Sequence, residues 1–496
     1  MHHQVAIIGA GFGGLGMGIR LKKSGNTSFI IFEKAAELGG TWRENRYPGC
    51  ACDVPANLYS FSFAQNPNWS RKYARQEEIL AYMKKTSQDF GMEEFIRYNS
   101  EVSEIKFIES AGHWEVKTKD GYACTAQIVV SATGPLSRPN MLNLKGKDSF
   151  KGDLFHTALW DSSFDPKGKR IAVVGTGASA IQAIPELAKD AKELYVFQRS
   201  APWILPRPDR SFHGIEKWMN RNIPGFLALK RQLLYLRLES SVNGFLGKSL
   251  MNDLATWGAN LHRKKSIKDP ELRRKTTPNY KLGCKRVLVS SDYYPALQLP
   301  HVELLETPAA EIKEHSIIDK QGKEYEVDAI LMATGFIASE IYLDMNIYGR
   351  AGQELIKSWE AEGPEAYYGL SVSGYPNLFF LLGPNTGLGH NSVVHMIESQ
   401  VNYVLDYMKV LKARGLKFLD IKSQVQEAHN EEIQEKLKST VWQSGGCQSW
   451  YQTSKGKNTT LWPGSTIKYR KITREVHPHA YQEVGQKEGA EKELIS

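Results

Sequence analysis

Apolar residues near the N-terminus form short runs separated by helical patterns, and the first run leads into a glycine-rich turn. Residues 5–8 form an apolar strand, residues 9–14 have the pattern G-x-G-x-x-G, and a helical pattern extends to Leu21. A second apolar strand, 29–32, ends at Glu33. This order is typical of a dinucleotide-binding fold, in which glycines let a pyrophosphate approach a helix N-terminus and the acid binds a ribose. The predicted contacts are Gly9, Gly11, Gly14 and Glu33.

The same pattern recurs later in the chain. Residues 170–174 form an apolar strand and 175–180 a second glycine-rich turn. A predicted helix then extends to Leu187, and 194–197 form a further strand. Here no acid follows, and Arg199 stands where a cation would pair with the 2′-phosphate of NADPH; the alternative is an ordinary surface arginine. We therefore predict FAD at the first unit and NADPH at the second. The predicted contacts of the second unit are Gly175, Gly177, Ser179, Ala180 and Arg199.

Two further apolar strands, 128–135 and 328–336, contain Ala-Thr-Gly and flank the second unit. They are typical of crossings between nested nucleotide domains, so Thr334 and Gly335 are also predicted cofactor contacts. The predicted class is α/β, with two Rossmann-like dinucleotide-binding domains, the NADPH domain inserted into the FAD domain, and a helical subdomain. The FAD domain is predicted in two parts, 1–140 and 331–481, and the second part includes a C-terminal substrate loop. The NADPH domain is predicted at 141–330, with a helical insert at about 212–275. A flexible tail is predicted at 482–496.

Composition refines this prediction. A chain of 496 residues with 41% hydrophobic and 24% charged residues is typical of a folded protein of two or three domains. The formal net charge of +9 is spread along the chain, and its densest part, 262–286, suits a phosphorylated cofactor or a solvated face better than nucleic acid. No His/Cys cluster has metal-ligand spacing, so no metal is expected.

Cysteine usage and apolar segments bear on location. The five cysteines are odd in number and scattered, which argues against a disulfide framework and for a reducing compartment. Cys50 and Cys52 have C-x-C spacing, unlike the pair of a disulfide reductase, and are expected to be packing residues. The apolar stretch 223–250 is interrupted by charges, so no transmembrane segment is expected. We predict a cytoplasmic protein, with peripheral membrane contact through the helical insert as the alternative.

The segment 150–161 carries a family resemblance. It matches F-x-G-x-x-x-H-x-x-x-W-D at every fixed position and lies between the two glycine-rich units. In this the chain resembles the class B flavoprotein monooxygenases and, through the Trp-Asp ending, their type I Baeyer–Villiger branch. We expect these residues to couple the domains during the catalytic cycle rather than to touch substrate. They are Phe150, Gly152, His156, Trp160 and Asp161.

Three other stretches are similar to the same family. Residues 38–63 resemble its segment beneath the flavin ring, 283–294 its Lys-Arg loop, and 449–464 its C-terminal loop over the substrate. The resemblance implies cofactor contacts from Gly40, Thr41, Trp42 and Lys285, and a substrate pocket that includes Trp450 and Tyr451. The turn 383–391 precedes a predicted helix, and Asn385 within it is a further predicted flavin contact.

The resemblance also implies an activity. NADPH would reduce FAD, the reduced flavin would add O2 to form a flavin peroxide, and one oxygen atom would be inserted next to a ketone carbonyl to give an ester or lactone, with sulfoxidation as a second reaction. Negative charge develops near the flavin, so a fixed cation is required. The resemblance assigns that role to Arg286, positioned by Asp53.

Other functions remain open on sequence alone. The chain could be an N- or S-oxygenating flavin monooxygenase, a non-catalytic flavin-binding or sensing protein, or a flavin reductase. The expected partners are O2 and a small-molecule ketone or sulfide, and no nucleic acid. The identity of the substrate and the oligomeric state do not follow from these patterns.

Overall fold

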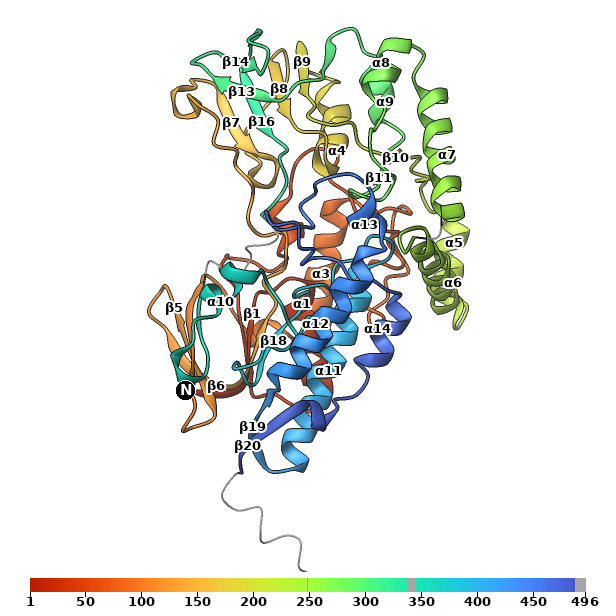
Figure 1. The fold of residues 1–496 in the computed structure, drawn as a ribbon. Helices are drawn as coiled ribbons and strands as arrows, with labels where there is room; N and C mark the ends of the chain where they lie inside the picture. The colour runs from red at the N-terminus through yellow and green to blue at the C-terminus, as the bar shows by residue number, and fades with distance from the viewer. Residues whose placement is uncertain (248, 338–344, 487–496) are drawn as a thin grey trace, which may run out of the picture.

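A computed structural model describes residues 1–247, 249–337 and 345–486 of the chain (Figure 1). It contains two large sheets, drawn one above the other in Figure 1, with helices α5, α6 and α7 on one side of the molecule. Each glycine-rich unit belongs to a different sheet, so the predicted α/β fold with two dinucleotide-binding units and a helical region is confirmed.

The first sheet has the strand order β17-β4-β5-β6-β1-β2-β3, with β18 paired to β6. Strands β1, β2, β6 and β18 are parallel, whereas β4, β5 and β6 form an antiparallel meander. The strand bounds are His2–Ile8, Phe29–Phe32, Ile96–Arg97, Val102–Ile108, His113–Thr118, Ala123–Ser131, Asn346–Tyr348 and Leu378–Phe380 for β1 to β6, β17 and β18. Helices α1, α3 and α11, at Phe12–Lys23, Gln76–Asp89 and Val393–Ala413, bury apolar side chains beside it.

The second sheet is all parallel, in the order β12-β9-β8-β16-β7. Its strands are Asp153–His156, Arg170–Val174, Glu193–Phe197, Val302–Leu305 and Ala329–Met332 for β7, β8, β9, β12 and β16. Helix α4, Ala178–Leu187, follows β8 as expected. Because β16 extends to Met332 and pairs within this sheet, a boundary at 330 would divide a strand. We therefore propose that the chain returns to the first sheet between β16 and β17.

The two crossings between the sheets lie side by side. Asn140 donates its backbone N–H to the Gly335 carbonyl at 2.9 Å, and its own carbonyl accepts from the Thr334 hydroxyl. Ile337 donates to the Arg138 carbonyl at 3.0 Å. Since both connections are hydrogen-bonded to each other, the two nucleotide units are joined through a paired double strand and not through two independent linkers.

The helical insert has an unusual distribution of side chains. Its helices are α5, α6, α7 and α8, at Gly214–Asn222, Phe226–Ser240, Ser249–Ser266 and Pro270–Lys275. Helix α6 buries Arg231 and Glu239 and exposes three leucines, Leu229, Leu233 and Leu236, by 58%, 59% and 47%. Arg231 donates to the carbonyls of Asn57 and Leu58 at 3.0 and 2.9 Å. The insert is therefore attached to the first domain through polar contacts, and its apolar face is turned outward.

The C-terminal part corrects one prediction. Helices α12, α13 and α14, at Ser423–Lys438, Val441–Ser444 and Thr466–Ile472, share one apolar cluster with α11. Strand β19, Leu416–Ile421, pairs with β20, Tyr481–Gln486, in antiparallel register. The predicted flexible tail from 482 was therefore wrong for 482–486, because backbone pairing with β19 orders this mostly polar segment. Residues 487–496 lie outside the described ranges.

Candidate active site

A cavity of about 860 Å³ lies at the carboxyl ends of strands from both sheets. It contains most of the predicted site residues: Gly9, Gly11, Glu33, Gly40, Thr41, Trp42, Asp53, Gly175, Gly177, Ser179, Arg199, Lys285, Arg286, Thr334, Gly335, Trp450 and Tyr451. Gly14, Ala180, Asn385 and the five fingerprint residues do not line it. A wider groove of about 1290 Å³, bordered by Arg20 and Arg470, contains neither glycine-rich turn, so it is not the candidate site.

The first glycine-rich turn is shaped by close backbone contacts. Gly9 has φ +102° and follows β1 directly. A Cβ on Gly14 would lie 1.8 Å from the Gly9 carbonyl oxygen, so Gly14 allows helix α1 to pack on the strand. Among the described residues, a Cβ on Gly11 would come within 4 Å of the Cα of Gly40 alone, at 3.8 Å, so this part of the backbone borders open space. These residues fit the pyrophosphate of FAD, with the N-terminus of α1 directed at the phosphates.

Glu33 is buried at the end of β2 and already has protein partners. Its Oε2 accepts from the Ala10 N–H at 2.9 Å, and its Oε1 accepts from Ala35 N and Arg43 Nη1 at 3.0 and 2.7 Å. A carboxylate has about four lone-pair positions, so Glu33 can still accept one hydrogen bond from a ribose. Arg43, which the sequence analysis did not single out, therefore positions the predicted ribose ligand.

Two cations adjoin the second glycine-rich turn. A Cβ on Gly177 would have no atom within 4 Å, so the turn at the start of α4 faces open space that suits a second pyrophosphate. Lys285 donates to the Ser200 hydroxyl at 2.7 Å, and its pKa is lowered by burial and by the nearby Arg199 charge. Neither cation forms an ion pair with a carboxylate in the ranges that the structure describes. Two close cations without an acid fit the 2′-phosphate of NADPH.

Arg286 and Asp53 meet inside the cavity. Arg286 Nε and Nη2 both donate to Asp53 Oδ2, at 3.1 and 2.6 Å. The Asp53 charge raises the pKa of Arg286 further above its usual value, so the guanidinium stays charged. The Arg286 side chain is 41% exposed. Burial raises the pKa of the Tyr451 hydroxyl above its usual value, and the Arg286 charge offsets part of that rise. The arrangement places a permanent cation where negative charge could be stabilised.

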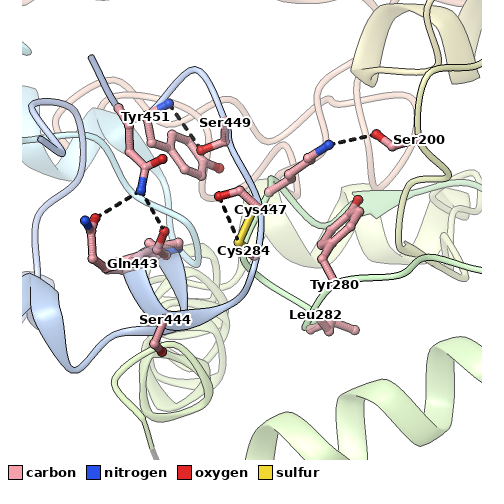
Figure 2. Close-up of a disulfide and its surroundings, with 12 residues drawn as sticks. Ser200, Tyr280, Leu282, Cys284, Gln443, Ser444, Cys447, Ser449 and Tyr451 are labelled. Carbon is pink, nitrogen blue, oxygen red and sulfur yellow. Dashed lines mark hydrogen bonds between the residues drawn. A yellow bond between two sulfur atoms is a disulfide. The ribbon is translucent and has the colours of Figure 1, made fainter. Parts of the chain in front are cut away.

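The cysteines include one pair that the sequence analysis missed. Cys284 and Cys447 form a disulfide with Cα atoms 6.1 Å apart, which overturns the expectation of a chain without disulfides (Figure 2). The 163 residues between them concealed the pairing, because only the fold brings the two loops together. Cys50, Cys52 and Cys124 are free and buried, and burial raises the pKa of the Cys50 thiol to about 12. The prediction that Cys50 and Cys52 are packing residues is confirmed.

The fingerprint segment packs between the domains. His156 is fully buried at the end of β7, burial lowers its pKa to about 4, and its ring lies 5.7 Å from Phe336. A Cβ on Gly152 would lie 2.3 Å from the Asp328 carbonyl and 2.8 Å from the Phe150 ring, so only glycine fits there. The fingerprint therefore touches the second crossing and lies outside the cavity, which supports a coupling role.

The remaining fingerprint residues have local partners. Trp160 packs edge-on against Phe155, with centroids 5.1 Å apart, and against Phe164 at 5.7 Å. The Asp161 carboxylate accepts from the backbone N–H and hydroxyl of Ser163, and these bonds lower its pKa. Both residues therefore stabilise the turn after β7.

Asn385 has a different role from the one predicted. Its side-chain amide donates to the carbonyls of Asn458 and Leu461 at 2.9 and 3.2 Å. It thus fixes the C-terminal segment, while Gly387, Leu388 and Asn391 of the same turn line the cavity. Asn391 donates to Glu239 of the insert at 2.7 Å. The turn before α11 therefore connects the cavity to the helical insert.

Gln182 is a cavity residue that sequence reasoning missed. It lies on α4, and its Oε1 accepts from the Tyr47 hydroxyl and the Ala51 N–H at 3.0 and 3.2 Å. Its Nε2 donates to the Ala51 carbonyl at 3.0 Å. These three bonds join the second nucleotide unit directly to the segment beside Asp53. A single glutamine on a helix carries no recognisable signal in the sequence.

The fold and the cavity define an oxidoreductase that brings two dinucleotides together beside a fixed cation. Within the described ranges, no cluster of three His, Cys, Asp or Glu residues could hold a metal ion. The family model described as pyridine nucleotide-disulphide oxidoreductase matches residues 6–228. A Baeyer–Villiger monooxygenase from Pseudomonas aeruginosa is 48% identical over 97% of this chain and 91% of its own length. The corresponding enzyme from Streptomyces coelicolor is 43% identical over 97% and 92%.

The chain belongs to the Baeyer–Villiger monooxygenases and is an FAD- and NADPH-dependent enzyme. A solved structure of OTEMO in complex with FAD and NADP has a TM-score of 0.88 and 27% identity, and covers 97% of this chain and 99% of that one. The reactants of the enzyme formed by this chain are O2 and a small-molecule substrate.

Proposed function

We propose that Arg286 is the catalytic cation of this monooxygenase and that Asp53 positions it. When bound, FAD takes hydride from NADPH and supplies an activated oxygen atom from O2. Attack on a ketone carbonyl places negative charge on the ketone oxygen. Nε and Nη2 of Arg286 are engaged by Asp53, and among the described residues Nη1 has no acceptor. Nη1 can therefore donate to that oxygen without a change in the Asp53 contact.

The substrate proposed for this site is a small ketone, with a sulfide as a second substrate. Trp450 and Tyr451 line the same cavity as Arg286, and Trp450 is 40% exposed while Tyr451 is buried. Their rings lie 4.6 Å apart. They offer an apolar wall beside the cation, which suits a molecule with one polar carbonyl and an apolar remainder.

The test is substitution of Arg286. Arg286→Ala is expected to lower the kcat for ketone oxidation by roughly 100- to 1000-fold, because one preorganised donor is lost. Anaerobic bleaching of the bound flavin by NADPH should stay within about threefold of the parent, since hydride transfer does not need a donor to the ketone. The measurements are ester formation by chromatography and stopped-flow absorbance, with Arg274→Ala, on exposed helix α8, as the matched control.

Two results would contradict this assignment. If Arg286→Ala oxidises ketones as fast as Arg274→Ala, Arg286 is not the catalytic cation. If the parent oxidises only sulfides and amines, the ketone proposal is wrong, and the N- or S-oxygenating alternative holds.

For location we infer a cytoplasmic enzyme, and the alternative is peripheral contact of the helical insert with an anionic membrane surface. No helix in the described ranges is long and apolar enough to cross a membrane. The insert instead exposes two tryptophans, Trp218 of α5 and Trp257 of α7, by 57% and 66%, in addition to the three leucines of α6. Six lysines and arginines that are not buried occur on the same helices, namely Lys217, Arg221, Lys230, Arg237, Lys264 and Lys265. Exposed apolar and aromatic side chains with basic neighbours suit an anionic lipid interface.

A further inference from the structure

The Cys284–Cys447 disulfide joins two loops that both contribute to the cavity (Figure 2). Cys284 is followed directly by Lys285 and Arg286, and Cys447 precedes Trp450 and Tyr451 by three and four residues. The bond therefore links the loop of the catalytic cation to the loop that forms the apolar wall.

The two loops also meet through their backbones. The Lys281 N–H donates to the Gly445 carbonyl at 3.0 Å. A Cβ on Gly445 would lie 2.6 Å from Cys284 Cβ and 2.8 Å from its sulfur, so only glycine permits this approach. Gly283, with φ +97°, lies against Phe245 and Val441. Because these contacts bring the two cysteines close without the bond, the dithiol form can reoxidise to the same pair.

The pair differs from the other cysteines of the chain. Cys50, Cys52 and Cys124 are buried, and burial raises the pKa of Cys124 to about 11 and that of Cys50 to about 12, so their thiolates are suppressed. Cys447 is partly exposed beside the exposed Gln448, and Cys284 precedes two cations that favour a thiolate. An oxidant in solution would thus react at Cys447 before the buried thiols.

We propose that Cys284 and Cys447 form a reversible oxidation site that controls the position of the Trp450–Tyr451 loop relative to Arg286. The predicted effect of this site on ketone oxidation rests on the proposed function, whereas the redox change of the two cysteines and the movement of the loop do not. In the oxidised form the loop is held over the cavity. In the reduced form it is retained only by weaker contacts, such as the Lys281–Gly445 bond, and opens more often.

The redox chemistry needs one peroxide and one dithiol. The Cys447 thiolate attacks hydrogen peroxide, an S–O bond forms, the O–O bond breaks and hydroxide leaves. The Cys284 sulfur then attacks the Cys447 sulfur, the S–S bond forms, the Cys447 S–O bond breaks, and its oxygen leaves as water with the Cys284 proton. In total two thiols and one peroxide give one disulfide and two waters, and each sulfur is oxidised by one electron. A dithiol reductant reverses the reaction by exchange.

The first test counts thiols and probes the loop without ketone. After peroxide treatment of the holoenzyme, three of the five cysteines should titrate in denaturant, and all five after dithiol treatment. Trypsin should cleave at Lys455, in the same loop, roughly threefold faster or more in the reduced protein. Cys447→Ala should be cleaved quickly under both conditions, whereas Cys124→Ala, which removes a buried cysteine of β6, should respond to redox conditions like the parent.

The second test measures ketone kinetics. Reduction of the parent should raise the KM for ketone by roughly threefold to tenfold with a smaller change in kcat, because the loop positions substrate and does not react with it. Cys447→Ala should show the raised KM under both conditions. Five titrating thiols after peroxide, or equal cleavage and equal KM in both redox states, would overturn the proposal. Absence of ketone oxidation in every sample would contradict the proposed function instead, and the thiol count and cleavage rates would still decide the present inference.

Discussion

At the scale of single residues, the clearest prediction concerns Arg199 and Lys285. Their charges lie close enough for Arg199 to lower the pKa of Lys285, and a bound phosphate would relieve that repulsion. Arg199→Ala is therefore expected to raise the KM for NADPH by roughly 10- to 100-fold, the value of one charged hydrogen bond. The kcat at saturating NADPH should change little, and the KM for NADH should stay within about twofold.

Steady-state kinetics with both nicotinamides decide this prediction. Arg274→Ala provides a matched control, since the Arg274 side chain is 60% exposed on α8 and is not among the residues that line the cavity. An equal loss with NADPH and NADH would show that Arg199 supports the fold of the turn and does not select the phosphate.

At the scale of elements, helix α6 has its polar side inward. Substitution of Leu233 and Leu236 by glutamate should leave the folded structure and its melting temperature nearly unchanged, because both side chains are exposed. It should weaken binding to vesicles with anionic headgroups by roughly tenfold or more, since apolar area is lost and negative charge is added. Cosedimentation with anionic and zwitterionic vesicles measures this, and Gln232→Glu on the same helix is the matched control.

Other occupants of this face would give different results. If the parent does not sediment with anionic vesicles but elutes as a dimer that the double variant dissociates, the face is an interface between two copies. A monomer that binds neither vesicle would also contradict membrane contact.

The elements near the glycine-rich turns could be predicted closely from the sequence. Strands β2 and β8 have the expected bounds, and α4 ends at Leu187 as expected, because apolar runs and glycines mark both ends of each unit. Strand β20 could not be predicted in this way. Its residues are mostly polar, and its order comes from backbone bonds to β19, a partner about 60 residues earlier in the sequence.

At the scale of the whole molecule, one buried and two half-buried histidines predict a dependence of stability on pH. Burial lowers the pKa of His156 and His429 to about 4 and that of His395 to about 3. Between pH 6.5 and 4 the unfolded chain binds protons that the folded chain does not, so the free energy of unfolding falls as the pH falls. Each histidine contributes a slope of about 1.4 kcal/mol per pH unit in this window.

Thermal denaturation of the holoenzyme between pH 7 and 5 tests this dependence. The melting temperature should fall towards pH 5, and the fall should be shallower in His429→Gln, which cannot bind the proton. His315→Gln, at an exposed position, should keep the slope of the parent. An unchanged slope in His429→Gln would contradict the assignment of the effect to His429.

The assembly of the site was only partly predictable. Arg286 and Asp53 were paired through a family resemblance, and the structure places them 2.6 Å apart. The Gln182 contacts and the Cys284–Cys447 bond were not predicted, because each joins residues more than 130 positions apart. Neither glutamine nor scattered cysteines have a local pattern, so only the folded arrangement reveals what they do.

The Gln182 contacts have a consequence for recombination between related enzymes. The segment with Tyr47 and Ala51 belongs to the first unit in sequence, but its hydrogen bonds attach it to α4 of the second. A chimera that exchanges the second nucleotide unit alone would pair α4 of one parent with the 47–51 segment of the other. In a chimera, α4 and the 47–51 segment should therefore come from the same parent, although more than 100 residues separate them in the sequence.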